Sequence, residues 1–231
     1  MAADYRAGVQ IRVTFEVKNL SCCRSGREVF SGLDFTLTPS ELLTVTGVNG
    51  SGKSSLLRLL AGFLRPSSGA MLWDGAPIAE DREVFGARTA YVGHLDAVKS
   101  ALTVEENLAF WAHFDGSAVG DTRVQLALQR VDLVAQANLP AGFLSAGQKR
   151  RLNLARLVAK PASLWLLDEP TAALDDKSSG TVADIIQEHC AQGGMAVVTT
   201  HQDLGIEAAQ SLDMNDYRPE SALGPNLELV S

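Results

Sequence analysis

A glycine-rich loop between a β-rich run and a helical run constrains the fold of this chain more than any other feature. The β-rich run is Leu42–Thr46; the helical run, Lys53–Ala61, carries leucines at helical spacing and is followed by Gly62. The loop reads Gly47-Val48-Asn49-Gly50-Ser51-Gly52-Lys53-Ser54, which satisfies the pattern G-x-x-x-x-G-K-[ST] in full. Its glycines let successive backbone N–H groups turn inward toward an anion, and the following helix adds the partial positive charge of its N-terminus. The sequence therefore predicts a phosphate-binding loop in an α/β fold.

Two side chains at the end of the loop complete the expected nucleotide site. The Lys53 ammonium can reach the β and γ phosphates of ATP, and the Ser54 hydroxyl can bind Mg²⁺. ATP and Mg²⁺ are therefore the predicted cofactors. From this loop, the residues predicted to bind ATP are Gly47, Val48, Asn49, Gly50, Ser51, Gly52, Lys53, Ser54 and Ser55.

A second apolar run ends in two acidic residues. Leu164–Leu167 is continuously apolar, as expected of a strand buried on both faces, and Asp168 and Glu169 follow it directly. Ligands of open α/β sheets bind at the carboxyl ends of the strands. Asp168 is therefore predicted to hold Mg²⁺, directly or through water, and Glu169 to orient and polarise the attacking water.

Strand and helix patterns alternate along the rest of the chain. Further strands are predicted at Val13–Val17, Phe35–Leu37, Met71–Trp73, Tyr91–Gly93 and Met195–Thr199. Helices are predicted at about Thr103–Trp111, Thr122–Val131 and Thr181–His189, and Thr103 with Glu106 fits a capping box. The alternation predicts one α/β domain at residues 11–215, with a helical insertion at about 96–157 and a loose C-terminal tail at 216–231.

Composition argues against several classes of function. The net charge of the 231 residues is −7, so no nucleic-acid partner is expected on a broad basic face. The basic run Lys149–Arg151 fits either the solvated face of a helix or a partner contact. No apolar run approaches the roughly 18 to 20 residues that cross a bilayer, and Met1–Arg6 lacks the apolar core of a secretory signal. Cys22, Cys23 and Cys190 are expected to be reduced thiols.

A second predicted helix also begins with a hydroxyl and a glycine. Leu144-Ser145-Ala146-Gly147-Gln148 precedes the helical stretch Lys149–Val158, which makes another site for an anion. Here the chain resembles the ABC ATPase family, whose signature is Leu-Ser-x-Gly-Gln. Thr171–Asp175 is similar to the loop of that family that crosses between subunits, and Val198–His201 to its switch segment. The resemblance covers about residues 13–208.

The resemblance implies a fold and a division of roles. The implied fold is an α/β P-loop NTPase core with an N-terminal antiparallel β subdomain and an inserted α-helical subdomain. Lys53, Glu169 and His201 are implied to be catalytic, with His201 contacting the γ phosphate, and Asp175 to lie in the loop between subunits. The implied partner is a second copy bound head to tail, whose ATP is contacted by the signature residues Leu144, Ser145, Ala146, Gly147 and Gln148.

Two positions depart from the family pattern. His94 occupies the place of a glutamine that in the family senses Mg²⁺ and couples to the membrane subunit. An imidazole can serve similarly, but its protonation changes near neutral pH. The aromatic residue that stacks on adenine is also missing, and Cys22-Cys23-Arg24 stands in its place. Arg24 is therefore expected to stack on the base through its guanidinium plane.

Within the family, the chain is most similar to the ATP-binding subunits of the cytochrome c maturation system, long described as haem exporters. The runs that carry this similarity are Phe30–Leu37, Ser54–Gly62, Tyr91–His94, Leu102–Leu108, Gly193-Gly194 and Thr200–Gln202. The similarity implies an integral membrane transporter subunit and haem-pathway proteins as partners. It also implies a peripheral location on the cytoplasmic face of the inner membrane.

Three other functions stay open at this point. The chain could serve another ABC transporter, act as a soluble ATP-driven switch, or hold ATP without turning it over. Soluble switches of this family usually carry two ATPase cassettes in one chain, whereas this chain has one. The acid Glu169 and the switch His201 argue against a module that only binds ATP.

Overall fold

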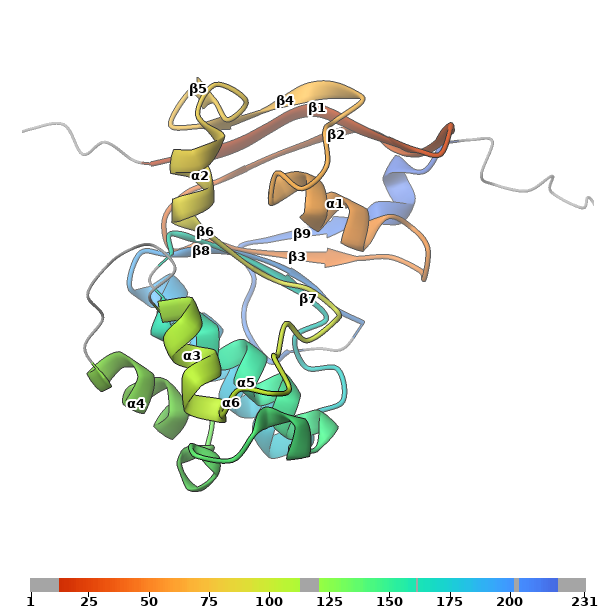
Figure 1. Cartoon of the computed structure of the whole chain (residues 1–231). Helices are drawn as coiled ribbons and strands as arrows, with labels where there is room; N and C mark the ends of the chain where they lie inside the picture. The colour runs from red at the N-terminus through yellow and green to blue at the C-terminus, as the bar shows by residue number, and fades with distance from the viewer. Residues whose placement is uncertain (1–12, 113–120, 161, 202–203, 220–231) are drawn as a thin grey trace, which may run out of the picture.

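The computed structural model describes residues 13–112, 121–160, 162–201 and 204–219. In these ranges the chain forms two β-sheets with helices packed between and beside them (Figure 1). The N-terminal segment 1–6 and residues 220–231 of the predicted tail lie outside the described residues. Within the described ranges, no helix is both long enough and apolar enough to span a membrane.

A parallel sheet forms the predicted α/β core. Its strand order among the described residues is β6-β7-β8-β3-β9, and each neighbouring pair is parallel. The strands are β3 (Leu42–Thr46), β6 (Thr89–Val92), β7 (Leu164–Asp168), β8 (Met195–Thr199) and β9 (Gln210–Asp213). The carboxyl ends of β3, β7 and β8 therefore lie side by side at one edge of the sheet. This arrangement confirms the predicted α/β class.

A second sheet is antiparallel and comes mainly from the N-terminal part of the chain. Its order is β2-β1-β4-β5, with β1 (Phe15–Arg24), β2 (Arg27–Leu37), β4 (Ser68–Trp73) and β5 (Ala76–Pro77). The expected antiparallel β subdomain is thus confirmed. The strand predicted at Val13–Val17 was too short, because register shifts after Val17 break the two-residue period on which the prediction rested.

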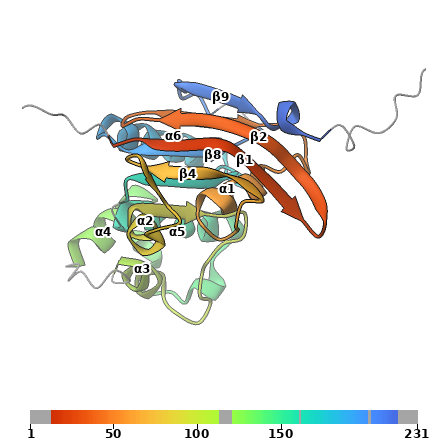
Figure 2. The same ribbon diagram turned by 90° about the horizontal axis from the view of Figure 1, so that it is seen from above.

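The helices form separate layers. Helix α1 (Lys53–Leu60) lies between the two sheets, whereas α3 (Val104–Ala112), α4 (Asp121–Arg130), α5 (Ala146–Ala159) and α6 (Asp176–Ala191) lie beyond the parallel sheet (Figure 1). The short helix α2 (Arg82–Arg88) precedes β6. Seen from above, α3–α5 gather on the side of the molecule opposite β9 (Figure 2). Short 3₁₀ helices, η1 (Val134–Gln136), η2 (Ala141–Phe143) and η3 (Met214–Tyr217), complete the described elements.

The parallel sheet separates two apolar cores. In β7, Leu164 and Leu166 pack into the core that contains α1, whereas Trp165 and Leu167 pack into the core that contains α5 and α6. Side chains alternate between the faces of a strand, so a strand buried on both faces must be apolar throughout. This explains why β7 and β8 are continuous apolar runs in the sequence.

Three predictions based on local pattern need correction. The helix predicted at Thr181–His189 begins earlier, at Asp176, because its first turns are polar and carry no apolar period. The strand β9 was not predicted, and the helix η3 extends into the segment predicted as a loose tail at 216–231. Arg150 is not on a solvated helix face, since only 3% of it is exposed. The predicted capping box of α3 is confirmed: Thr103 and Glu106 exchange side chain-to-backbone hydrogen bonds of 2.8 and 3.1 Å.

His189 of α6 is packed into the second core. Its ring stacks on the indole of Trp165, with the centroids 3.7 Å apart and the planes 2° from parallel. Nε2 lies 3.2 Å from the carbonyl oxygen of Met195, which fits a neutral ring that donates there. Burial lowers the pKa of His189, and the contact with Met195 opposes this shift. A Cβ on Gly194 would lie 2.2 Å from the ring, so glycine is required there for the stack.

This packing predicts a pH-dependent contribution to stability. Because the unfolded chain binds the His189 proton more tightly than the folded chain, the contribution is present above the ordinary histidine pKa of about 6.5. It is lost as pH falls below that value toward the lower pKa of the folded state. We expect wild-type protein to lose more unfolding free energy between pH 7.5 and 5.5 than His189→Phe, which keeps an aromatic ring without the titration. Urea unfolding of both proteins at both pH values measures this difference, and titrations common to both proteins cancel. Equal losses would contradict the prediction.

Candidate nucleotide-binding site

The phosphate-loop residues and the predicted acids meet at one edge of the parallel sheet. The loop follows β3, Asp168 ends β7 and is followed by Glu169, and His201 comes shortly after β8. A cavity of about 600 Å³ opens there. It is lined by Val29, Asn49, Gly50, Gly52, Lys53, Ser54, Ser55, His94, Asp168, Glu169, Ala172 and His201.

The loop has the backbone that its glycines predict. Gly47, Gly50 and Gly52 have φ angles of 133°, 82° and 105°, in the region that disfavours side chains. Gly52 also packs closely, because a Cβ there would lie 2.8 Å from Cγ1 of Val29. Gly52 is the N-cap of α1 and has no side-chain cap, and the first turn carries no acid. The N-terminal N–H groups of α1 are thus available to an anion.

Lys53 is folded back onto its own loop. The residue is 7% exposed, and its Nζ donates to the carbonyl oxygens of Gly47 at 2.7 Å and Val48 at 3.3 Å. A buried ammonium is stabilised by such acceptors, but phosphate oxygens are charged and form stronger hydrogen bonds. The side chain therefore has both the position and the chemistry to exchange these carbonyls for a phosphate.

Asp168 has one carboxylate oxygen that no group in the described residues satisfies. The side chain is 2% exposed; Oδ1 accepts a 2.9 Å hydrogen bond from Oγ1 of Thr199, while Oδ2 is buried without a partner. Buried polar atoms are usually paired, so an unpaired carboxylate oxygen indicates a missing ligand. The Ser54 hydroxyl lines the same cavity. Oxygen donors of this kind, together with phosphates and water, fit Mg²⁺.

Glu169 is held in a strained backbone conformation. Its φ is 49°, which is uncommon for a residue other than glycine and is a feature of functional sites. Its N–H donates to both the carbonyl and the hydroxyl oxygen of Thr199, each at 3.1 Å. Oε1 lies 3.2 Å from Nε2 of His201, within ion-pair distance, although the geometry is not that of a hydrogen bond. The predicted base and the predicted switch residue are therefore neighbours.

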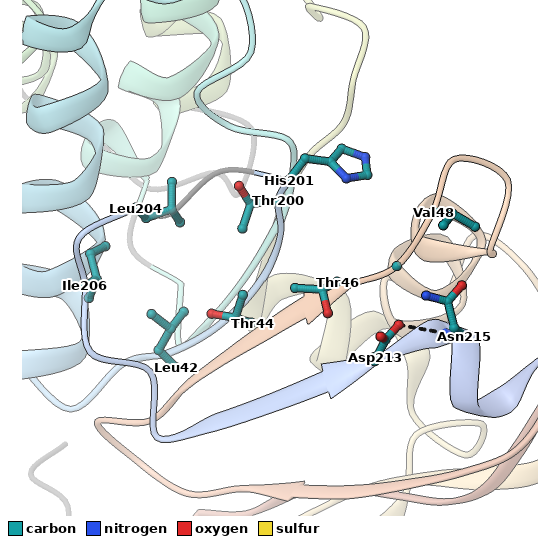
Figure 3. Close-up of a pocket in the computed structure, with 11 residues that line it drawn as sticks. Leu42, Thr44, Thr46, Val48, Thr200, His201, Leu204, Ile206, Asp213 and Asn215 are labelled. Carbon is teal, nitrogen blue, oxygen red and sulfur yellow. Dashed lines mark hydrogen bonds between the residues drawn. The ribbon is translucent and has the colours of Figure 1, made fainter.

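A second cavity adjoins the first through His201. It has a volume of about 570 Å³ and is lined in part by Leu42, Thr44 and Thr46 of β3 (Figure 3). Gly47 and Val48 of the phosphate loop also line it. His201 thus stands between two cavities.

The two residues that depart from the family pattern, His94 and Arg24, differ in whether they line the nucleotide cavity. His94 is exposed and lines the nucleotide cavity, as the prediction requires. Arg24 lies at the exposed end of β1, pairs with Arg27 across the hairpin, and is not among the residues that line the cavity. Val29 of β2 does line it, although no motif in the sequence points to this residue. A valine in a strand gives no local sign that it faces a ligand.

The signature residues 144–148 lie at the N-terminus of α5. Ser145 is the N-cap of α5: its Oγ accepts from the N–H of Gln148 at 3.2 Å, and Oε1 of Gln148 accepts from the N–H of Ser145 at 2.9 Å. None of residues 144–148 lines the cavity at the phosphate loop. Asp175 caps α6 in the same manner, accepting from the N–H of Ser178 at 2.8 Å, and hydrogen bonding from Ser178 lowers its pKa.

Comparisons with known proteins point to one family. A family model for ABC transporters matches residues 30–172. The chain is 53% identical over 206 residues to the cytochrome c biogenesis ATP-binding export protein CcmA of Paramagnetospirillum magneticum, covering 88% of this chain and 95% of that protein. It is 50% identical over 215 residues to the protein of the same name from Rhodospirillum rubrum, covering 93% and 91%.

Solved structures share the fold. A putative ABC transporter ATP-binding protein from Pyrococcus furiosus has a TM-score of 0.80 at 24% identity, covering 89% of this chain and all of that one. An ATP-binding subunit of an ABC transporter has a TM-score of 0.74 at 26% identity, covering 81% and 79%. The family match spans the phosphate loop, residues 144–148 and the acids that follow β7. The chain is therefore a member of the ABC transporter family, an ATP-binding protein of the ABC ATPase type.

Proposed function

We propose that this ABC-type ATPase powers a transporter complex of c-type cytochrome biogenesis, in haem export or in the release of a haem carrier. The observation that carries the proposal is the identity of 50–53% to two cytochrome c biogenesis ATP-binding export proteins, over more than nine-tenths of each. The nucleotide cavity supports it, because the side chains proposed to bind and hydrolyse ATP converge there.

The proposed binding step uses the phosphate loop. The phosphates of ATP lie against the N–H groups of residues 47–55, and Lys53 exchanges its two carbonyl acceptors for β and γ oxygens. Ser54 and Asp168 would hold Mg²⁺, which would supply positive charge to the phosphates. The unpaired Oδ2 of Asp168 supports this assignment. For adenine, stacking by Arg24 stays a prediction, and Val29 is a further candidate contact.

The proposed hydrolytic step uses Glu169 and His201. Glu169 accepts a hydrogen bond from the attacking water and directs it at the γ phosphate, and His201 contacts that phosphate. Their separation of 3.2 Å supports a shared task. His94 at the rim of the cavity senses the occupant in place of the glutamine of other family members.

Two copies are proposed to act head to tail. Ser145 and Ala146 are exposed, and the helix start that they form does not face the cavity of its own chain. A helix N-terminus of this type can bind the γ phosphate held by another copy, with Asp175 in the loop between the subunits. Hydrolysis then removes the charge that draws the two helix N-termini together, so the dimer opens.

A groove beside the nucleotide cavity is the proposed dock for the membrane subunit. It has a volume of about 740 Å³ and shares His94 with the nucleotide cavity. Phe63 and Leu95 on it are 65% and 82% exposed. Arg58, Arg156 and Lys160 also line it, without an acidic side chain among its lining residues, and burial lowers the pKa of Arg156 to about 10. These features support an apolar segment of the membrane subunit that carries a carboxylate as the occupant of the groove. The location that we propose for the chain is peripheral, on the cytoplasmic face of the inner membrane.

A haem stain of whole cells tests the biological role. In cells whose single gene copy encodes Lys53→Ala, we expect loss of proteins that carry covalently attached c-type haem, with the variant present at the normal level. The matched control is Lys18→Ala, because Lys18 is an exposed lysine of β1 that pairs with Glu16. Normal staining in the Lys53→Ala cells would contradict a role in cytochrome c biogenesis, although the chain would still be an ATPase of the ABC type.

A further inference from the structure

The guanidinium of Arg150 is buried near the nucleotide cavity and donates hydrogen bonds through all three of its nitrogens. Arg150 lies on the second turn of α5, is 3% exposed, and turns toward the end of β7. Nε donates to the carbonyl oxygen of Pro170 at 3.2 Å; Nη2 donates to those of Asp168 at 2.9 Å and Glu169 at 2.6 Å. Nη1 donates to the carbonyl oxygen of Gly93 at 2.9 Å and to Oδ1 of Asp96 at 3.3 Å. Arginine has five N–H donors, and five acceptors meet them here.

Three of these acceptors explain the strain at Glu169. Successive carbonyl groups of an extended strand point in alternating directions, so those of residues 168, 169 and 170 can converge on one guanidinium only if the chain turns sharply. The φ of 49° at Glu169 is part of that turn. Arg150 holds the Glu169 carbonyl while Thr199 holds its N–H, so both ends of the residue are fixed. The direction of the carboxylate follows from this backbone.

The other two acceptors lie on the loop that carries His94. Gly93 and Asp96 flank this residue, and Asn153 of α5 donates a second, 3.3 Å hydrogen bond to Oδ1 of Asp96. His94 lines the nucleotide cavity together with Glu169. One side chain therefore ties the turn at Glu169 to the loop at His94.

We propose that Arg150 is a positioning residue for ATP hydrolysis. Its guanidinium holds the turn at Glu169 and the loop at His94 in a single geometry, so that the Glu169 carboxylate meets the attacking water at the γ phosphate. Arg150 touches neither ATP nor water in this role, so it should affect the chemical step and not nucleotide binding. The inference rests on the proposed catalytic role of Glu169.

The test compares three variants in steady-state ATPase assays. Arg150→Met keeps the length but removes all five donors, and Arg150→Lys keeps the charge but not the planar fork. Arg151→Met is the matched control, because neighbouring Arg151 donates to the carbonyls of Val131 and Asp132, away from the cavity. We expect kcat to fall about 10-fold to 10²-fold in Arg150→Met, the scale of a small misplacement of a reacting group, with KM changed by less than about 3-fold. Arg150→Lys should be intermediate, and the control should stay within about 2-fold of wild type in both constants.

A second measurement separates positioning from a structural role. In the Glu169→Gln background, adding Arg150→Met should change the Kd of a fluorescent ATP analogue by less than about 3-fold. The proposal would be overturned if Arg150→Met lost kcat, nucleotide affinity and folded fraction together. It would also be overturned if Arg150→Met folded and kept the wild-type kcat. If Arg150→Met does not fold, the kcat of Arg150→Lys decides by the same criterion. Full turnover by Glu169→Gln alone would instead refute the proposed function of Glu169, which distinguishes the two failures.

Discussion

Glu169→Gln should lose ATP turnover by about 10²-fold to 10⁴-fold while still binding ATP, the range expected when a general base is removed. The glutamine keeps the shape of the side chain, but its amide cannot accept a proton from the attacking water. The backbone contacts of residue 169 with Thr199 and Arg150 involve main-chain atoms and survive the substitution. A phosphate-release assay measures turnover, and a fluorescent ATP analogue measures binding.

The control for this variant is Glu80→Gln, which changes an exposed glutamate away from the nucleotide cavity. It should behave as wild type in both assays. Hydrolysis near the wild-type rate by Glu169→Gln in the purified complex would remove Glu169 from the mechanism. His201, 3.2 Å away, would then be the first residue to test as the base.

Lys53→Ala should lower turnover by roughly 10²-fold or more, the scale seen when a preorganised charge-stabilising group is removed. Unlike Glu169→Gln, it should also weaken ATP binding, because the Lys53 ammonium is proposed to contact phosphate oxygens in both the ground state and the transition state. The same two assays distinguish the variants: Glu169→Gln should separate binding from turnover, and Lys53→Ala should reduce both.

Lys18→Ala serves as the control for Lys53→Ala in solution as it does in cells. Lys18 lies on β1 and pairs with Glu16 at 2.7 Å on the protein surface. Removing this exposed pair should have little effect on turnover or binding. Unchanged turnover by Lys53→Ala would refute the phosphate role of this lysine.

The nucleotide site could be predicted because its parts are local. The phosphate loop needs glycines, a lysine and a serine at consecutive positions, so its backbone requirement is written in a single segment. Asp168 and Glu169 were found in the same way, because a buried parallel strand is apolar throughout and the change to acids marks its end. Parallel strands then bring these segments to the same edge of the sheet.

Contacts between distant segments were not visible in the sequence. Val29 faces the cavity because β2 passes close to Gly52, and the pairing of the antiparallel sheet decides that approach. Arg24, by contrast, sits at the end of its hairpin, and its predicted contact with adenine is untested. The start of α6 was missed because its first turns face solvent and have no apolar period.

Arg150 shows most clearly the difference between what the sequence determines and what only the tertiary structure decides. As part of Lys149–Arg151 it resembled a solvated charge run, since charged residues are rarely buried without partners. Four of its five partners are carbonyl oxygens, from segments as much as 57 residues away in the chain, and every residue type offers a carbonyl. The sequence alone determined the family, the phosphate loop and the acids, because these depend on the types of neighbouring residues. The tertiary structure decided which charge is buried and what it holds, because those contacts involve backbone atoms that only folding brings together.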